Sequence, residues 1–472
     1  MTQLHELSAQ ELVAVVRAGS LQPSQLVEHY LKRIEASGNT LGAFTEITAS
    51  TARARARHLD GSSDEDRSRG ALWALPLADK DLVARAGVPT RYGSKAREGY
   101  VPAQSDPLAI ALDEAGSISL GKTNTPEFGL TGYTETRVAP PARDPWNPKN
   151  GAGGSSGGAA VAVAAGLLPF APASDGGGSI RIPAATVGVV GLKPSRGRLA
   201  LGSGLDGPGG LVVTGPIART AADAAFFLDA MTGFQPYSYA TGARDRSPFT
   251  SATNSIDAGA KLHVGVTTVS PWDDDEDIVL DADARAAVQH AADLLTNSGD
   301  AVSNMLWQPR GYAAMFRTLW RASAARIPLS EDDLSLVEPI TAWLVREGRS
   351  LSAVALLESL AAATRFEQET IKAFSNYDVV LTPALAQSPR RVGWYDPVDA
   401  ERNFAQQVKY APYSSFVNVA GLPAIVLPLT TDAAGHPVSV QLIGKPGGER
   451  AILATAARLE RERGALLHPP SW

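Results

Sequence analysis

Residues 151–183 read GAGGSSGGAAVAVAAGLLPFAPASDGGGSIRIP, and the rest of the chain is organised around this stretch. Two glycine-rich turns, GAGGSSGG and ASDGGGSIR, enclose a short apolar segment from Ala159 to Phe170. A buried segment between them holds two serine-bearing turns at a fixed separation, and catalytic groups need such fixed placement. The pattern therefore predicts a catalytic site rather than a linker.

The second turn contains a candidate nucleophile and a candidate oxyanion hole. Acyl transfer requires an activated hydroxyl and donors aimed at the developing negative charge. Ser179 follows Gly176, Gly177 and Gly178, and backbone N–H groups at glycines can approach a substrate because no side chain intervenes. We expect these three N–H groups, with that of Ser179, to form the oxyanion hole. Taken alone, the segment is equally compatible with an ordinary glycine-rich turn from strand to helix.

The general base is harder to identify. The seven histidines lie outside the glycine-rich stretch without recognisable local context, and the chain has no cysteine, which excludes disulfides and a thiolate nucleophile. Lys80 ends the apolar segment ALWALPLADKDL at residues 71–82. In an extended strand Asp79 and Asp81 point away from the side that Lys80 faces, so the lysine can enter a pocket without either carboxylate. A surface lysine paired with its neighbours is the alternative.

Two further patterns suggest other functions. GSISLGKT at residues 116–123 matches the phosphate-loop pattern GxxxxGK[ST]. However, Ile118 and Leu120 alternate as in a strand, and PLAIALDEAG before them has a helical period where a strand is required. Nucleotide binding stays a remote alternative. The acidic run at residues 273–277 fits no cation-binding loop and indicates solvated acids ahead of a helix.

Composition bounds the remaining classes. The 472 residues are 44% hydrophobic and 19% charged, with a formal net charge of −6, which argues against a nucleic-acid partner. The longest apolar run, residues 159–168, is far shorter than the roughly 20 residues that span a bilayer. We expect a cytoplasmic protein that needs no metal or cofactor and does not bind membranes. Alternating helical and apolar strand-like segments, among them residues 376–386, 421–429 and 437–444, favour an α/β fold.

Six sequence blocks, in order across about residues 70–445, resemble the successive blocks of the amidase signature family. They are PLADKDL, GKTNTPEFG, GGSSGG, SDGGGSIRIPA, VGLKPSRGR and the late pair GLPAIVLPL and PVSVQLIG. The resemblance implies one domain over residues 1–472, with a single large mixed β-sheet covered by helices on both faces. Within it we expect a helical part at about 1–65, a core at about 70–230, a variable and largely helical region at about 237–376, and C-terminal strands and a helix at 377–472.

The resemblance also implies a Ser-cisSer-Lys triad. Ser179 matches the nucleophile, Ser155 matches the bridging serine that follows a cis peptide bond, and Lys80 matches the base. The separation of 24 residues between the two serines is also that of the family. Lys80 must be uncharged to accept a proton, so its pKa must lie about 3 units below the ordinary value of about 10.4, which burial can achieve.

Supporting residues and two departures complete the comparison with the family. Asp175, Arg181 and Gly154 match residues of the structural shell around the two turns. Gly176 stands where threonine or another residue with a side chain is usual, which predicts a wider pocket or a looser oxyanion loop. Asp144 replaces the asparagine of the family's Asn-Pro-Trp element. Neither departure removes a catalytic group.

The expected reaction is hydrolysis of the C–N bond of small apolar or aryl amides, or of carbamates (urethanase activity). Aromatic residues in the variable region, Phe316, Trp320, Trp343 and Phe374, are candidates for core or pocket walls. Within the family, the glutaminase subunit of a tRNA-dependent amidotransferase is the alternative. The expected partner is the small-molecule amide or carbamate, and the expected state is a monomer or a homodimer.

Overall fold

The computed structural model describes residues 3–199, 207–232, 245, 247–254, 261–465 and 468–469. Its strands are β1 (Phe44–Ile47), β2 (Pro76–Lys80), β3 (Ile118–Thr123), β4 (Phe170–Asp175), β5 (Val190–Lys193), β6 (Val213–Ala218), β7 (His263–Val266), β8 (Ala301–Asn304), β9 (Val379–Pro383), β10 (Ala424–Thr431) and β11 (Pro437–Gly444). Its α-helices are α1 (Ala9–Arg17), α2 (Pro23–Ser37), α3 (Ala49–Asp60), α4 (Asp64–Arg69), α5 (Pro107–Glu114), α6 (Gly157–Ala164), α7 (Arg181–Val187), α8 (Ala221–Thr232), α9 (Thr250–Asn254), α10 (Ala282–Asn297), α11 (Tyr312–Ala325), α12 (Pro339–Arg349), α13 (Ala353–Phe374), α14 (Ala400–Tyr410), α15 (Ser415–Val419) and α16 (Glu449–Arg463).

A large mixed sheet forms the centre of the molecule. Eight strands pair in the order β4-β6-β5-β10-β11-β9-β7-β8. Pairing is antiparallel from β4 through β9, whereas β7 pairs in parallel with both β9 and β8. The three apolar segments expected to be strands in the C-terminal part are β9, β10 and β11. The predicted α/β fold around a large mixed sheet is confirmed.

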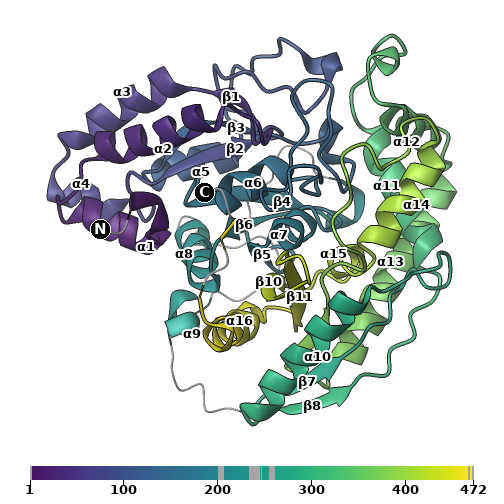
Figure 1. Ribbon diagram of the computed structural model, residues 1–472. Helices are drawn as coiled ribbons and strands as arrows, with labels where there is room; N and C mark the ends of the chain where they lie inside the picture. The colour runs from purple at the N-terminus through teal and green to yellow at the C-terminus, as the bar shows by residue number, and fades with distance from the viewer. Residues whose placement is uncertain are drawn as a thin grey trace.

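Helices cover both faces of this sheet (Figure 1). On one face, α8, α10 and α16 pack on strands β5, β6 and β9 to β11. On the other, α6 packs on β4 and β6, and α7 packs on β5, β10 and β11. The helix α6 is buried all round because its sequence is glycine, alanine and valine alone, which suits a helix enclosed by other elements.

A separate three-stranded sheet, in the order β1-β3-β2, lies next to the edge of the large sheet, where β2 packs beside β4. Strand β3 carries the GSISLGKT pattern. Its Lys122 is fully buried and donates a hydrogen bond to the carbonyl of Val83. A phosphate-binding loop needs exposed backbone N–H groups ahead of a helix, and here the residues form a buried strand. The structure therefore excludes the phosphate-loop interpretation of this pattern.

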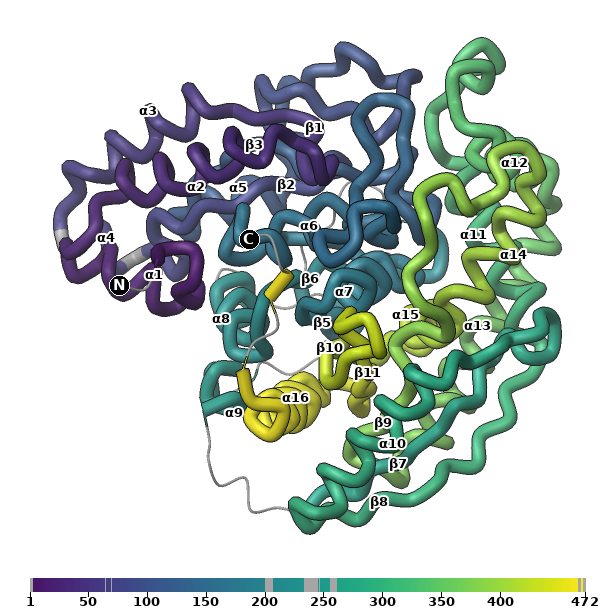
Figure 2. Tube along the Cα trace, viewed as in Figure 1, coloured from purple at the N-terminus to yellow at the C-terminus, as the bar shows by residue number. Residues whose placement is uncertain are grey.

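A second hydrophobic core lies between the large sheet and the helices α11 to α14, which form the right-hand side of the view in Figure 1. Helices α14 and α15, close to the C-terminal strands in sequence, lie beside α12 and α13, as Figure 2 also shows. Within the region at about 237–376 that was expected to be largely helical, residues 311–376 contain the helices α11, α12 and α13. The candidate site lies where this second core meets the glycine-rich turns.

Three further features concern the acidic run, membrane-spanning helices and the start of the variable region. In the acidic run, Asp275 and Glu276 form ion pairs with Arg317, and the described residues contain no group of three or more acidic or histidine side chains that could hold a metal ion. The structure describes no helix long and apolar enough to cross a membrane. The first part of the variable region, residues 237–260, lies mostly outside the described residues.

Candidate active site

Strand β2 delivers Lys80 into the interior at its C-terminal end. The Lys80 side chain is fully buried, and its Nζ lies 2.8 Å from Ser155 Oγ and 3.3 Å from Ser174 Oγ. The flanking carboxylates face elsewhere: Asp79 pairs with Arg85 at 2.7 Å, and Asp81 accepts the N–H of Arg91 at 3.1 Å. The alternation expected for an extended strand therefore holds, and Lys80 enters the site without a neighbouring carboxylate.

Burial controls the charge of Lys80. Loss of hydration lowers the pKa of Lys80 to about 7, against a smaller opposing effect of the Asp175 carboxylate. A substantial fraction of this lysine is therefore uncharged at neutral pH, as a proton acceptor must be. Lys193 at the end of β5 is a second buried lysine whose pKa is lowered to about 7, but it donates to the carbonyl of Pro194 and lines neither cavity described below.

The first glycine-rich turn places Ser155 against Lys80. The peptide bond between Gly154 and Ser155 is cis. A Cβ at Gly154 would lie 2.7 to 2.8 Å from the backbone of Tyr133, so no larger residue fits there. The N–H of Ser156 donates to the carbonyl of Ser179 at 3.1 Å. The two serine-bearing turns are thus joined directly, as well as through the apolar segment between them.

Ser179 lies between β4 and α7 and faces a cavity of about 190 Å³ that Ser155 and Ser174 also line. Ser174, the residue before Asp175 in β4, was not identified from the sequence. Its hydroxyl is within hydrogen-bonding distance of Lys80 Nζ, and it stands in the same sequence block as the nucleophile. Lys80 Nζ thus contacts two of the three serines that line the cavity, Ser155 and Ser174.

The backbone N–H groups of the second turn divide into two sets. The N–H of Gly178 donates to Asp175 Oδ1 at 2.7 Å, so it is not available to a substrate. Among the described residues, the N–H groups of Gly176, Gly177 and Ser179 have no protein acceptor. The candidate oxyanion hole therefore narrows to these three donors. Aspartate side chains often accept backbone N–H groups a few residues ahead, so Asp175 was the signal in the sequence that one of these N–H groups would be engaged.

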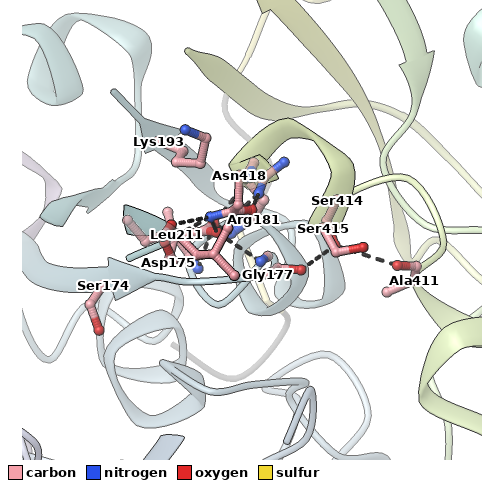
Figure 3. Close-up of polar contacts among 12 residues, drawn as sticks. Ser174, Asp175, Gly177, Arg181, Lys193, Leu211, Ala411, Ser414, Ser415 and Asn418 are labelled. Carbon is pink, nitrogen blue, oxygen red and sulfur yellow. Dashed lines mark hydrogen bonds and ion pairs between the residues drawn. The ribbon is translucent and has the colours of Figure 1, made fainter. Parts of the chain in front are cut away.

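The peptide between Gly177 and Gly178 is fixed at both ends. Ser414 Oγ donates to the carbonyl of Gly177 at 2.7 Å (Figure 3). The N–H of Gly178 is held by Asp175. The φ angle of Gly178 is +128°, and a Cβ there would lie 2.3 Å from Ser414 Oγ. Glycine is required at this position because both the backbone conformation and the space exclude a side chain.

Asp175 and Arg181 form an ion pair beside the turn (Figure 3). Both are fully buried, and two guanidinium nitrogens of Arg181 lie 3.0 Å from the two carboxylate oxygens of Asp175. Burial alone would raise the pKa of Asp175, but the charge and hydrogen bonds of Arg181 outweigh it and hold the pKa well below its ordinary range. The structure therefore places a buried ion pair of Asp175 and Arg181 against the turn that carries Ser179.

Asn418 and Gln441 complete this network and were not identified from the sequence. Asn418 Nδ2 lies within 3.0 Å of the Asp175 carbonyl, the Asp175 carboxylate and the Leu211 carbonyl, and Asn418 Oδ1 accepts from Arg181 at 2.6 Å. Gln441 Oε1 accepts from Arg181 at 2.8 Å. These residues come from α15 and β11, more than 200 positions after the turn, so no local pattern links them to it.

Replacement of Asn418 by alanine is expected to affect both stability and turnover. It removes the side-chain donor from the buried carbonyls of Asp175 and Leu211 and the acceptor from one N–H of Arg181, which predicts a loss of about 3 kcal/mol in the free energy of unfolding. Because the loop carrying the oxyanion donors loses its support, we also expect kcat to fall about 10- to 100-fold with a smaller change in KM. Urea titration and steady-state kinetics at a temperature where both proteins are folded check this. An unchanged kcat would contradict a role in positioning the loop.

Two cavities flank Ser179. The larger, of about 190 Å³, is walled mainly by Leu82, Phe128, Leu130, Leu211 and Ile327; the smaller, of about 70 Å³, is walled by Trp272, Phe316, Phe404 and Val408. Trp320 contributes to both. Of the four aromatic residues singled out in the variable region, Phe316 and Trp320 line the site, whereas Trp343 and Phe374 pack in the second core. Apolar walls on both sides of a hydroxyl suit an uncharged amide.

The two departures from the family pattern have different consequences. Gly176 lines the larger cavity, where a Cβ would lie 3.1 Å from Val212 and 3.6 Å from Trp320, so its glycine enlarges that cavity. Asp144 is buried and lines neither cavity. Its Oδ2 lies 2.8 Å from Nε2 of His436. The carboxylate at position 144 is therefore compensated by a histidine from the turn between β10 and β11.

The chain is similar to known proteins over most of its length. A family model described as Amidase matches residues 25–453. A putative amidase of Mycobacterium tuberculosis is 35% identical over 449 residues, which cover 94% of each chain. A glutamyl-tRNA(Gln) amidotransferase component from an Anaeromyxobacter strain is 32% identical over 501 residues, with 99% of this chain and 98% of that protein covered.

Two solved structures share the fold across their full length. A 6-aminohexanoate cyclic dimer hydrolase superposes with a TM-score of 0.89 at 27% identity and covers 100% of this chain and 99% of its own. A bacterial aryl acylamidase of the amidase signature family superposes with a TM-score of 0.83 at 25% identity, with 96% of each chain covered.

Proposed function

Because the chain belongs to the amidase signature family of hydrolases that act on carbon–nitrogen bonds, we propose that it hydrolyses small apolar or aryl amides through a covalent intermediate on Ser179. The single observation that carries the proposal is the buried contact of 2.8 Å between Lys80 Nζ and Ser155 Oγ beside Ser179. A lysine with a pKa of about 7 and two serines in one cavity supply a base, a relay and a nucleophile.

The proton steps follow from this arrangement. Uncharged Lys80 accepts the proton of Ser155 Oγ as Ser155 accepts that of Ser179 Oγ, and Ser179 Oγ attacks the carbonyl carbon. The N–H groups of Gly176, Gly177 and Ser179 stabilise the oxyanion. The proton then returns from Lys80 through Ser155 to the substrate nitrogen, the C–N bond breaks and the amine leaves. Water attacks the acyl ester by the same relay and releases the acid.

Carbamates are the second substrate class. Attack on a carbamate carbonyl uses the same nucleophile and donors, and the larger cavity of about 190 Å³ borders Ser179 with mainly apolar walls. An aryl anilide and an aryl carbamate of matched size, assayed on the purified protein, measure the order of preference. Inactivity on both would contradict the proposed function.

Glutamine is a poorer fit. Free glutamine carries an α-ammonium group and an α-carboxylate, and both need charged or strongly polar partners. Among the described residues that line the two cavities, the single charged side chain is Arg326, and no carboxylate is present to hold the ammonium group. This supports a stand-alone amidase over a glutaminase subunit. Glutamine belongs in the substrate panel, and it should be hydrolysed more slowly than the anilide.

The pH dependence of turnover should report the charge of Lys80. Protonated Lys80 cannot accept the Ser155 proton, so kcat/KM is expected to rise with pH through about 7 and to level off above it. Lys193 has a similar pKa but lies outside the cavities, which makes Lys193→Met the matched control. The inflection should persist in that variant. Loss of the inflection in Lys193→Met would show that Lys193, and not Lys80, controls the pH dependence of turnover.

A further inference from the structure

The larger cavity has one charged side chain on its wall. Arg326 immediately follows α11 and borders the cavity together with Ser323, Ile327 and Pro328. The other described lining residues are apolar, glycine or serine, and no acidic side chain is among them. A ligand in this cavity therefore meets a single positive charge in otherwise neutral surroundings.

The neighbouring arginines are already engaged, whereas Arg326 is not. Arg97 donates to the carbonyl of Pro328 at 2.8 Å, and Arg349 donates to the carbonyl of Leu329 at 2.5 Å. These two guanidinium groups brace the loop that follows α11. In the described part of the chain, the Arg326 side chain has no hydrogen-bond or ion-pair partner. Arg326 is exposed, and the five N–H donors of its guanidinium can turn to a ligand.

The position favours an anion over other ligand groups. Arg326 is at the C-terminal end of a helix of 14 residues, where a cation is stabilised by the helix dipole. Its planar fork matches the two oxygens of a carboxylate, and such charge-assisted pairs are the stronger kind of hydrogen bond. With a formal net charge of −6, the protein as a whole does not attract anions, so a preference for them would have to arise locally.

We propose that Arg326 binds a carboxylate on the substrate. The preferred substrates are then amides in which the substituent that occupies the larger cavity ends in a carboxylate. Arg326 is then a specificity-determining residue, and Ser179 attacks an amide bond separated from the carboxylate by an apolar spacer. This inference rests on the proposed amidase function and adds the substrate class to it. A lone carboxylate contact also differs from glutamine recognition, which needs a partner for the ammonium group.

Two pairs of probes test the proposal. Acetanilide and 4-acetamidobenzoate differ by a carboxylate on the amine side, and benzamide and 4-carbamoylbenzoate differ by one on the acyl side. We expect one carboxylate to exceed its neutral parent in kcat/KM by about fivefold or more at low salt, mainly through KM. The pair that shows the preference also identifies which part of the substrate occupies the larger cavity.

Substitution then assigns the preference to Arg326. The ratio of kcat/KM for the carboxylate to that for its parent should fall at least about fivefold in Arg326→Gln and further in Arg326→Glu. Arg346→Gln is the matched control, since Arg346 is also exposed but lines neither cavity, and its ratio should equal that of the wild type. Equal ratios in the wild type and Arg326→Gln, with the neutral parents hydrolysed, would overturn the proposal and leave the amidase function standing.

Binding without turnover separates the two proposals further. In a Ser179→Ala background, calorimetry should show tighter binding of the preferred carboxylate probe than of its parent, and Arg326→Gln should remove the difference. Failure to hydrolyse any of the four probes by the wild type would count against the amidase function for such substrates, whereas the binding difference tests Arg326 itself. Equal binding of both probes by the two proteins would refute the role of Arg326.

Discussion

Ser179→Ala is expected to abolish hydrolysis, with a fall in kcat of at least about four orders of magnitude and little change in stability. Ser179 faces the cavity with 8% of its surface exposed, and its hydroxyl is the one that follows the three glycine residues of the turn. Removal of one oxygen leaves the backbone N–H groups and the Asp175 network in place. The residual rate of an anilide and the thermal unfolding of the variant measure the two effects.

Ser156→Ala is the matched control for the nucleophile. Ser156 is a buried serine of the other glycine-rich turn, its Oγ lies 3.4 Å from the carbonyl of Ser174, and it lines neither cavity. We expect its loss to reduce kcat by less than about tenfold, as for a single neutral hydrogen bond. A sulfonyl fluoride should label Ser179 in the wild type and in this control. Substantial hydrolysis by Ser179→Ala would show that another serine is the nucleophile.

The parts of the site that the sequence revealed are those fixed by local geometry. Glycines on either side of a serine, and the alternation that separates Lys80 from Asp79 and Asp81, follow from the backbone alone. The resemblance to a family then supplied the relation between Lys80 and Ser155, which lie 75 positions apart. The resemblance also implied the large mixed sheet and the largely helical region at about 237–376.

The residues that sequence reasoning missed depend on tertiary contacts. Asn418, Gln441 and Ser414 reach the nucleophile turn from segments more than 200 positions away, and an asparagine within an apolar segment has no local feature that names its partner. The small sheet that carries Lys80 is separate from the large one because β2 packs beside β4 while its pairing partner is β3. The run of three glycines gave no sign that the Gly178 N–H differs from its neighbours. Asp175, whose carboxylate accepts that N–H, was the one local feature that could have indicated it.

Lys80→Met is expected to be nearly as damaging as loss of the nucleophile, with kcat reduced by about three to four orders of magnitude, because the relay through Ser155 then has no base. Methionine has a similar length and fills the same buried space with an apolar group. Turnover of the anilide and the free energy of unfolding, each measured between pH 6 and 10, test the role of the amine separately from its contribution to folding.

Lys80→Met should affect stability and activity in opposite directions. The pKa of Lys80 is about 7 in the folded protein and near its ordinary value in the unfolded chain, so between these values the unfolded state binds the extra proton. Lys80 therefore lowers stability progressively as pH falls from about 10 towards 7, and Lys80→Met should remove this part of the pH dependence. The variant is expected to be inactive yet at least as stable as the wild type at pH 7. Lys193, whose pKa is also lowered to about 7, keeps its own share of the pH dependence in the variant. A variant that is inactive because it unfolds, or one whose stability depends on pH as steeply as that of the wild type, would contradict a buried and uncharged lysine as the base.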